Sequence, residues 1–288
     1  MSIYRRVLIP VDLKPGRQMM APAVRRIVDT RDAEITFLHV VESQPWVGRA
    51  GHTLRLMNEL ENLANRQFGG VRLARRIEWG RPADCILNVL RTDRLDVVLM
   101  GAGGPSLYGD PFGAVAAEVL AEAPCPVLLE WPDTARVTQA RIQPVCCAVE
   151  LDGDETRVLA EAARVAGHCE APLILICPFT FDGARAAALL EWKAREREMA
   201  RVRRRVEDLR DGFAPGAAIR IDPGHAASVI SRALRLYDAV LLVTGNSREA
   251  LRAAHGECPV LCINAAARQR SAGHEDVEDC EFATGRSA

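Results

Sequence analysis

The sequence predicts the α/β fold class, in the form of two tandem doubly wound domains. Each domain is expected to contain a five-stranded parallel sheet with flanking helices. Three observations support this. Apolar runs of strand length alternate with segments of helical periodicity, one buried run ends in a glycine-rich loop that leads into a helix, and short segments of the first half recur in the second. We expect the domains at residues 1–135 and 142–265 and a disordered, polar tail at residues 266–288.

The first half of the chain contains four apolar runs of strand length and one segment, residues 71–79, that alternates as an edge or half-exposed strand does. We expect strands at residues 4–11, 35–41, 71–79, 97–100 and 127–130. Apolar residues at helical spacing between these runs predict helices at residues 19–28, 53–68, 82–90 and 113–122. The third helix begins at Pro82, and proline is favoured in the first turn of a helix.

The second half repeats this alternation. We expect strands at residues 144–149, 173–177, 219–221, 239–243 and 260–263, and helices at residues 156–166, 186–209 and 228–236. Three segment pairs set the correspondence between the halves: residues 79–86 match 223–230, 96–100 match 238–242, and 124–128 match 257–261. The second half is shorter between its fourth and fifth strands. There the glycine loop is reduced to Thr244-Gly245-Asn246-Ser247, with a short connection to Cys258.

The glycine loop of the first half has the features of an anion-binding site. It follows the apolar run at residues 97–100 and contains Gly101, Gly103 and Gly104, and Gly113 stands at the start of the next helix. Glycines allow the backbone to approach a ligand closely. The free N–H groups and the dipole at a helix N-terminus favour negative charge. The pattern therefore predicts a cradle for an anionic group between the fourth strand and the following helix.

Composition argues against several classes of function. The formal net charge of -1 gives no overall attraction to nucleic acid or to anionic membranes. No apolar run approaches the roughly 18 residues that span a bilayer, so we expect a cytoplasmic protein with no nucleic acid or membrane as partner. The nine cysteines lack Cys-x-x-Cys spacing, which favours buried, reduced thiols, and no metal site is predicted. Residues 191–210 alternate Arg and Glu as in a solvated helix with internal ion pairs.

Several motifs together resemble the universal stress protein family. They are Val7-Leu-Ile-Pro-Val-Asp12, Leu38-His39-Val40, Gly80-x-Pro-Ala, Met100-Gly101, Gly113-Ala-Val-Ala-Ala-Glu-Val-Leu and Ala123-Pro-Cys-Pro-Val127. The similarity extends from residue 3 to residue 264 and is that of a tandem member with two such domains. It implies a Rossmann-like fold of the adenine nucleotide alpha hydrolase type in each domain.

The resemblance also implies a nucleotide site in the first domain. Its residues would be Pro10, Val11, Asp12, Val40, Met100, Gly101, Gly103, Gly104, Gly113, Ala114 and Val115. The implied ligand is ATP or AMP, with Mg²⁺ only alongside ATP. The first and fourth strands are expected to be neighbours where the sheet reverses its order, the place at which open α/β sheets bind ligands. The alternative for Asp12 is a turn or helix-cap aspartate.

The loop departs from the pattern of nucleotide-binding members. Those members have Gly-x₂-Gly-x₉-Gly-Ser/Thr, whereas this sequence has eight residues between Gly104 and Gly113 and Ala114 in place of the hydroxyl residue. A missing hydroxyl contact costs about 0.5–1.5 kcal/mol. Pro105 and Pro111 also lack N–H donors. In the second domain Glu150 stands where the first has Asp12, so we expect no family-type nucleotide site there.

Two hypotheses for function follow. In one, the first domain binds an adenine nucleotide and the protein is a sensor or regulator of the stress response. In the other, it is a scaffold that acts through protein contacts alone. No catalytic residues are predicted, so the protein is expected to be at most a weak ATPase. Its protein partners are not identified, and a homodimer is left open. Members of the family commonly pair through their last strands, so the resemblance implies an intramolecular pseudo-dimer of the two domains. It would place residues 127–129 beside residues 260–263 and cover an apolar edge strand.

Overall fold

The structure is a computed structural model of the full chain. It describes residues 3–13, 27–28, 33–42, 49–68, 72–102, 112–131, 143–151, 153–180, 188–245 and 247–264. The predicted tail at residues 266–288 lies outside the described residues. Of the helix predicted at residues 19–28, only residues 27 and 28 are described, and both are buried.

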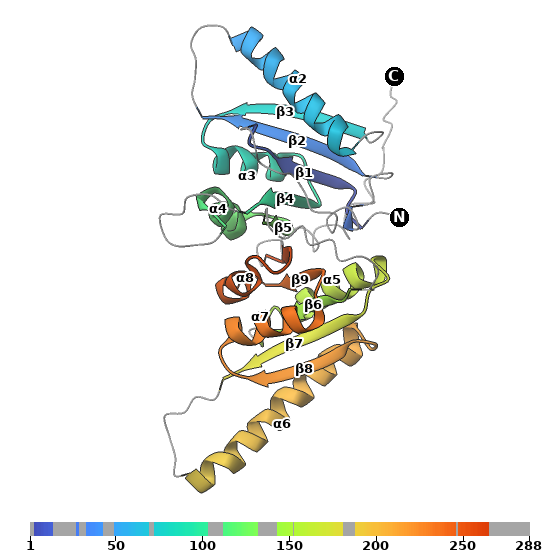
Figure 1. The fold of residues 1–288 in the computed structure, drawn as a ribbon, viewed down its shortest axis with the longest axis vertical. Helices are drawn as coiled ribbons and strands as arrows, with labels where there is room; N and C mark the ends of the chain where they lie inside the picture. Colours follow the sequence, from blue (N-terminus) through green and yellow to red (C-terminus); the bar gives the residue numbers. More distant parts are fainter. Residues whose placement is uncertain are drawn as a thin grey trace, which may run out of the picture.

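The chain forms a ten-stranded sheet that runs through both halves (Figure 1). Its strands, in sequence order, are β1 (Arg6–Pro10), β2 (Glu34–Val41), β3 (Arg72–Trp79), β4 (Val97–Gly101), β5 (Val127–Glu130), β6 (Val145–Ala148), β7 (Leu173–Phe179), β8 (Ala218–Pro223), β9 (Leu241–Thr244) and β10 (Val260–Cys262). Their order across the sheet is β3-β2-β1-β4-β5-β10-β9-β6-β7-β8. Each half is a parallel five-stranded unit with the same strand order, which confirms the predicted fold class.

Seven helices are described along this sheet. They are α2 (Arg49–Phe68), α3 (Pro82–Thr92), α4 (Ala114–Glu122), α5 (Glu155–His168), α6 (Ala188–Phe213), α7 (Ala226–Tyr237) and α8 (Arg248–Ala254). The helices expected from the sequence did not include one between Gly245 and Cys258, and the structure has α8 there. Ser247 caps it by accepting a hydrogen bond from the Ala250 N–H at 3.3 Å, and the four alanine and leucine residues of α8 are buried.

Two apolar clusters cover the two faces of the sheet. One contains buried residues of α3, α4, α7 and α8, and the other contains buried residues of α2, α5 and α6. Alternate strand residues enter opposite clusters, as Leu128 and Leu129 do. The strands are therefore buried on both faces, which explains their unbroken apolar runs. In Figure 1, α2 and α6 lie at the two ends of the molecule.

The halves meet through an antiparallel pair of strands. In this pair Val260 lies opposite Leu129 and Cys262 lies opposite Val127, while the other strand pairs of the sheet are parallel. These are the two strands that the sequence predicted to be neighbours. Each strand thus covers the apolar edge that the other would expose.

Two side-chain contacts reinforce this junction. The ring of Trp131 lies edge-on to the ring of His255, with 5.7 Å between centroids. The Asn264 side-chain amide donates a hydrogen bond to the Ala123 carbonyl at 3.2 Å. Ala123 and His255 are the C-cap residues of α4 and α8, so the two contacts link equivalent helix ends to the opposite half.

The register of the sheet corrects one of the sequence matches between the halves. Val7 pairs with Val97, and its counterpart Val145 pairs with Leu241. The fourth strands are therefore offset by two residues from the match of residues 96–100 with 238–242. Backbone conformation agrees, because Arg94 (φ 47°) and Asp238 (φ 50°) are both left-handed and follow the corresponding helices. Asp238 thus corresponds to Arg94, and Tyr237 to Asp93.

Candidate functional site

The first half has a switch in strand order at β1. This strand pairs with β2 on one side and with β4 on the other, so the carboxyl ends of β1 and β4 lie side by side. Asp12 follows the end of β1, and Gly101 is the last residue of β4. The predicted neighbourhood of the first and fourth strands is confirmed. Connections leave such a point in opposite directions, which opens a crevice in α/β sheets.

The chain just before Asp12 is held by two contacts from β2. The Val11 N–H donates to the Leu38 carbonyl at 2.8 Å, and His39 Nδ1 lies 2.9 Å from the Val11 carbonyl oxygen. A carbonyl oxygen only accepts, so Nδ1 carries the proton and donates. His39 therefore fixes the backbone from which Asp12 projects. In the sequence His39 stands only within the Leu38-His39-Val40 motif of a predicted strand, which gave no sign of this contact.

The end of β4 leaves open space. Gly101 is exposed, and a Cβ added to it would meet no described atom within 4 Å. The next residue is anchored, since the Ala102 N–H donates to the Glu130 carbonyl at 2.5 Å. Met100 is buried, with 7 % of its surface exposed. Among the described residues, none thus blocks the backbone at Gly101.

The helix that follows the loop begins at Gly113, where the backbone has a conformation that favours glycine. Gly113 is the N-cap of α4 and has φ 83°, a value that favours glycine. No described side chain caps this end, and the first turn has no acidic residue. Phe112 is buried in the same cluster as Met100 and Ala102, which ties the helix start to the end of β4. The backbone N–H groups that open α4 are thus suited to an anionic group.

Glu130 is a carboxyl group that sequence reasoning missed. It is the last residue of β5 and pairs with Gly101. Burial raises the pKa of Glu130 to about 7. The only sequence signal was its position at the end of the apolar run at residues 127–130. A carboxyl group that titrates near neutral pH therefore lies on the strand beside the glycine.

The predicted site residues fall into three groups. Pro10, Val11, Asp12, Val40, Met100 and Gly101 lie at the carboxyl ends of β1, β2 and β4, whereas Gly113, Ala114 and Val115 lie at the start of α4. Gly103 and Gly104 lie outside the described residues. Pro10, Asp12 and Val40 are half-buried, and Ala114 is exposed.

The second half has the same switch point with different residues. Glu150 follows β6, and Gly245 follows β9, which is the neighbour of β6. Thr244 is fully buried, and its hydroxyl has no hydrogen-bond partner among the described residues. The helix after this strand, α8, has seven residues. The glycine loop of the first half thus has no equivalent between residues 247 and 264, and α8 is two residues shorter than its counterpart α4.

Among the described residues, no helix is both long and apolar enough to cross a membrane.

Residues 3–129 match the model of the universal stress protein family. A universal stress protein of Thermus aquaticus is 27% identical over 135 residues, which cover 44% of this chain and 98% of that protein. One of Methanocaldococcus jannaschii is 27% identical over 140 residues, covering 44% of this chain and 82% of that protein.

A solved universal stress protein of Archaeoglobus fulgidus is similar to the whole fold. Its TM-score is 0.59 at 16% identity, and the alignment covers 90% of this chain and 96% of that one. At this identity the likeness concerns the fold alone. Residues 3–129 thus form a universal stress protein domain, and the C-terminal half of the chain repeats the strand order of this domain.

Proposed function

We propose that the N-terminal half binds an adenine nucleotide, ATP or AMP, at the carboxyl ends of β1 and β4, and that the protein acts as a sensor or regulator of the stress response. The observation that carries this proposal is the adjacency of β1 and β4 at the switch in strand order, with Asp12 at one strand end and the open Gly101 at the other. Ligands of open α/β sheets bind at such points.

The residues present suit the parts of a nucleotide. Asp12 would accept hydrogen bonds from ribose hydroxyls or adenine amino groups, since an ionised carboxylate is an acceptor. Val40 and Met100 provide half-buried and buried apolar surface for the base. The uncapped N–H groups at Gly113 and beyond would take the phosphates, and these donors do not depend on the missing hydroxyl of Ala114.

The second half is proposed to lack this site. Glu150 is longer than Asp12 by one methylene group, the glycine loop is missing, and α8 occupies part of the connection. The proposed role of this half is to support the first through β10. Neither half contains a described group that we assign to hydrolysis, so bound nucleotide is proposed to act as a signal.

Isothermal titration of nucleotide-stripped protein with ATP and with AMP tests the proposal. We expect saturable binding that Asp12→Ala weakens and Gly101→Val abolishes. A Cβ at residue 101 meets no described atom within 4 Å, so we expect Gly101→Val to obstruct the proposed ligand without disturbing the described fold. The matched control is Gly245→Val in the second half, where the nearest atom to a Cβ is the Val158 Cγ2 at 3.9 Å.

The outcomes are distinct. Binding that survives both Asp12→Ala and Gly101→Val would show that the nucleotide lies elsewhere. Absence of heat with both nucleotides at millimolar concentration would contradict the proposal and leave the scaffold hypothesis. Loss of binding in Gly245→Val alone would move the site to the second half.

A further inference from the structure

A cavity lies at the amino ends of the strands of the first half, whereas the proposed nucleotide site lies at their carboxyl ends. Its volume is about 220 Å³, and its lining consists of Arg6, Glu34, Thr36, Ala74, Arg75, Arg76, Asp93 and Leu95. Arg6 and Glu34 are the first residues of β1 and β2, and Leu95 precedes β4. The cavity therefore opens at the amino ends of these strands. Liquid water occupies about 30 Å³ per molecule, so a ligand of at least roughly seven non-hydrogen atoms fits.

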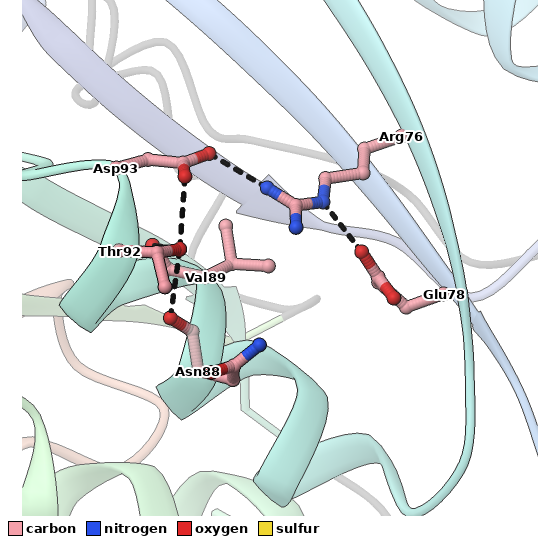
Figure 2. A network of polar contacts seen from close by, with 6 residues as sticks. All are labelled: Arg76, Glu78, Asn88, Val89, Thr92 and Asp93. Carbon is pink, nitrogen blue, oxygen red and sulfur yellow. Dashed lines mark hydrogen bonds and ion pairs between the residues drawn. The ribbon is translucent and has the colours of Figure 1, made fainter.

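One wall of the cavity is a fixed ion-pair network (Figure 2). Arg76 of β3 donates from Nε to Glu78 at 2.6 Å and from Nη1 to Asp93 at 2.7 Å, at the end of α3. The Thr92 hydroxyl lies between Asp93 and the carbonyl groups of α3. Arg76 thus ties the edge strand to the helix. Its charge is already matched by two carboxylates.

The second half contains the same network, which identifies its role. Arg220 corresponds to Arg76 and donates from Nε to Asp222 at 2.6 Å and from Nη1 to the Tyr237 hydroxyl at 3.3 Å. Both halves thus connect an edge strand to the helix end through an arginine. Because the network is present in both halves, we assign it to the stability of the fold.

The remaining polar groups of the cavity are found only in the first half. Arg6, Glu34 and Thr36 lie on adjacent strands, with Arg6 opposite Glu34. The equivalent strands β6 and β7 place Pro144, Pro172 and Ile174 at these positions. Proline and isoleucine complete the same fold without a charge or a hydroxyl. The polar trio of Arg6, Glu34 and Thr36 is therefore not required by the architecture.

The polar trio also has unused bonding capacity. Among the described residues, none forms an ion pair with Arg6 or Glu34, and none forms a hydrogen bond with the Thr36 hydroxyl. Neighbouring strands lie about 4.8 Å apart, so the two charged side chains start side by side. A cation, a carboxylate and a hydroxyl are thus available together at the mouth of one cavity.

The charge balance selects the class of ligand. A phosphate would meet Arg6 but would be repelled by Glu34 and Asp93, and the other two arginines are paired with Glu61 and Glu78. A simple amine would leave Arg6 unmatched. A small zwitterion satisfies both charges, because its carboxylate can pair with Arg6 and its ammonium group with Glu34.

We propose that this cavity binds a free α-amino acid or a similar small zwitterion, with its carboxylate on Arg6, its ammonium group on Glu34 and a hydrogen bond to Thr36. The site is separate from the nucleotide site, which lies at the carboxyl ends of the same strands. Ala74 and Leu95 provide apolar lining for a short side chain.

Ligand-observed NMR of the full-length protein with a panel of L-α-amino acids tests this. We expect saturation transfer from the protein to at least one amino acid. Acetate and methylamine, each with one of the two charges, are expected to give none. Arg6→Ala and Glu34→Gln should each weaken binding by about ten- to a hundredfold, the effect of one charge-assisted contact.

The matched control is Arg5→Ala. Arg5 is exposed and adjacent in sequence, but it does not line the cavity. We expect this variant to bind normally, and Asp12→Ala, which tests the nucleotide site, to bind the amino acid normally as well. Thermal melts of all variants check that they fold.

Three results would overturn the proposal. One is the absence of saturation transfer from the folded protein to every amino acid of the panel. Another is undiminished binding in both Arg6→Ala and Glu34→Gln. The third is binding of acetate or inorganic phosphate as tight as that of the amino acids, which would make the cavity an anion site.

Discussion

The hydroxyl of Tyr4 donates a hydrogen bond to the carboxylate of Glu161, so the start of the chain is fastened to α5 in the other half. Tyr4 is 2 % exposed, and the Arg164 guanidinium lies 4.8 Å from its ring centroid. Arg164 also donates to the Ile3 carbonyl at 2.9 Å. The junction of the halves thus has a polar latch, formed by Tyr4, Glu161 and Arg164, besides its strand pair.

Tyr4→Phe is expected to destabilise the protein by about 1–2 kcal/mol, because Glu161 loses a hydrogen bond in a partly buried place. Urea unfolding followed by circular dichroism measures this. Tyr237→Phe is the control for a tyrosine contact within one half. If Tyr4→Phe unfolds at the same urea concentration as the unmodified protein, the latch does not contribute to stability.

Glu130 predicts a pH dependence of stability. Burial raises the pKa of Glu130 from 4.5 to about 7, so the folded protein holds a proton that the unfolded chain has released. Stability is therefore expected to fall as the pH rises from about 4.5 to about 7, by about 1–3 kcal/mol after allowance for partial exposure.

Glu130→Gln should remove this dependence and stabilise the protein above neutral pH. The measurement is urea unfolding of both proteins at several pH values across that range. A variant with the same pH profile as the unmodified protein would show that another group titrates.

Gly113→Ala is expected to cost about 1–2 kcal/mol, since φ 83° is unfavourable for a residue with a Cβ. The control is Gly167→Ala inside α5, where a Cβ meets no described atom and the helix gains about 0.5–1 kcal/mol. Differential scanning calorimetry gives both values. Equal melting temperatures for the two variants would contradict the assignment of a strained cap at Gly113.

Thr244→Val is expected to stabilise the protein by up to about 1 kcal/mol. The threonine hydroxyl is fully buried without a partner among the described residues, and valine has nearly the same shape. Chemical denaturation measures the change. A loss of stability would show that the hydroxyl has a partner beyond those residues.

Strand positions could be predicted because strands buried on both faces have uninterrupted apolar runs, such as Val97–Met100. The pairing of residues 127–129 with 260–263 was implied by the resemblance to the family, and the protection of an apolar edge strand is its physical reason. The correspondence of Asp96 with Asp238 was wrong because the two sequences agree locally, whereas the left-handed turns at Arg94 and Asp238 set the true register.

The features that sequence could not provide depend on neighbours distant in the chain. Glu130 has its raised pKa because the folded protein buries it. His39 supports Asp12 through a carbonyl group 28 residues earlier in the chain. The helix α8, by contrast, could have been predicted from the sequence. Ser247 is a favoured N-cap residue, and alanine and leucine residues follow it.

The antiparallel pairing of β5 with β10 reverses the direction of one half relative to the other. The amino ends of β1 and β2 therefore share a rim of the molecule with the carboxyl ends of β6 and β9. A macromolecule resting on that rim would meet the polar trio and the carboxyl ends of β6 and β9 together, while the proposed nucleotide site would remain free on the opposite rim. A nucleotide bound at one rim and a macromolecule bound at the other would therefore not compete sterically.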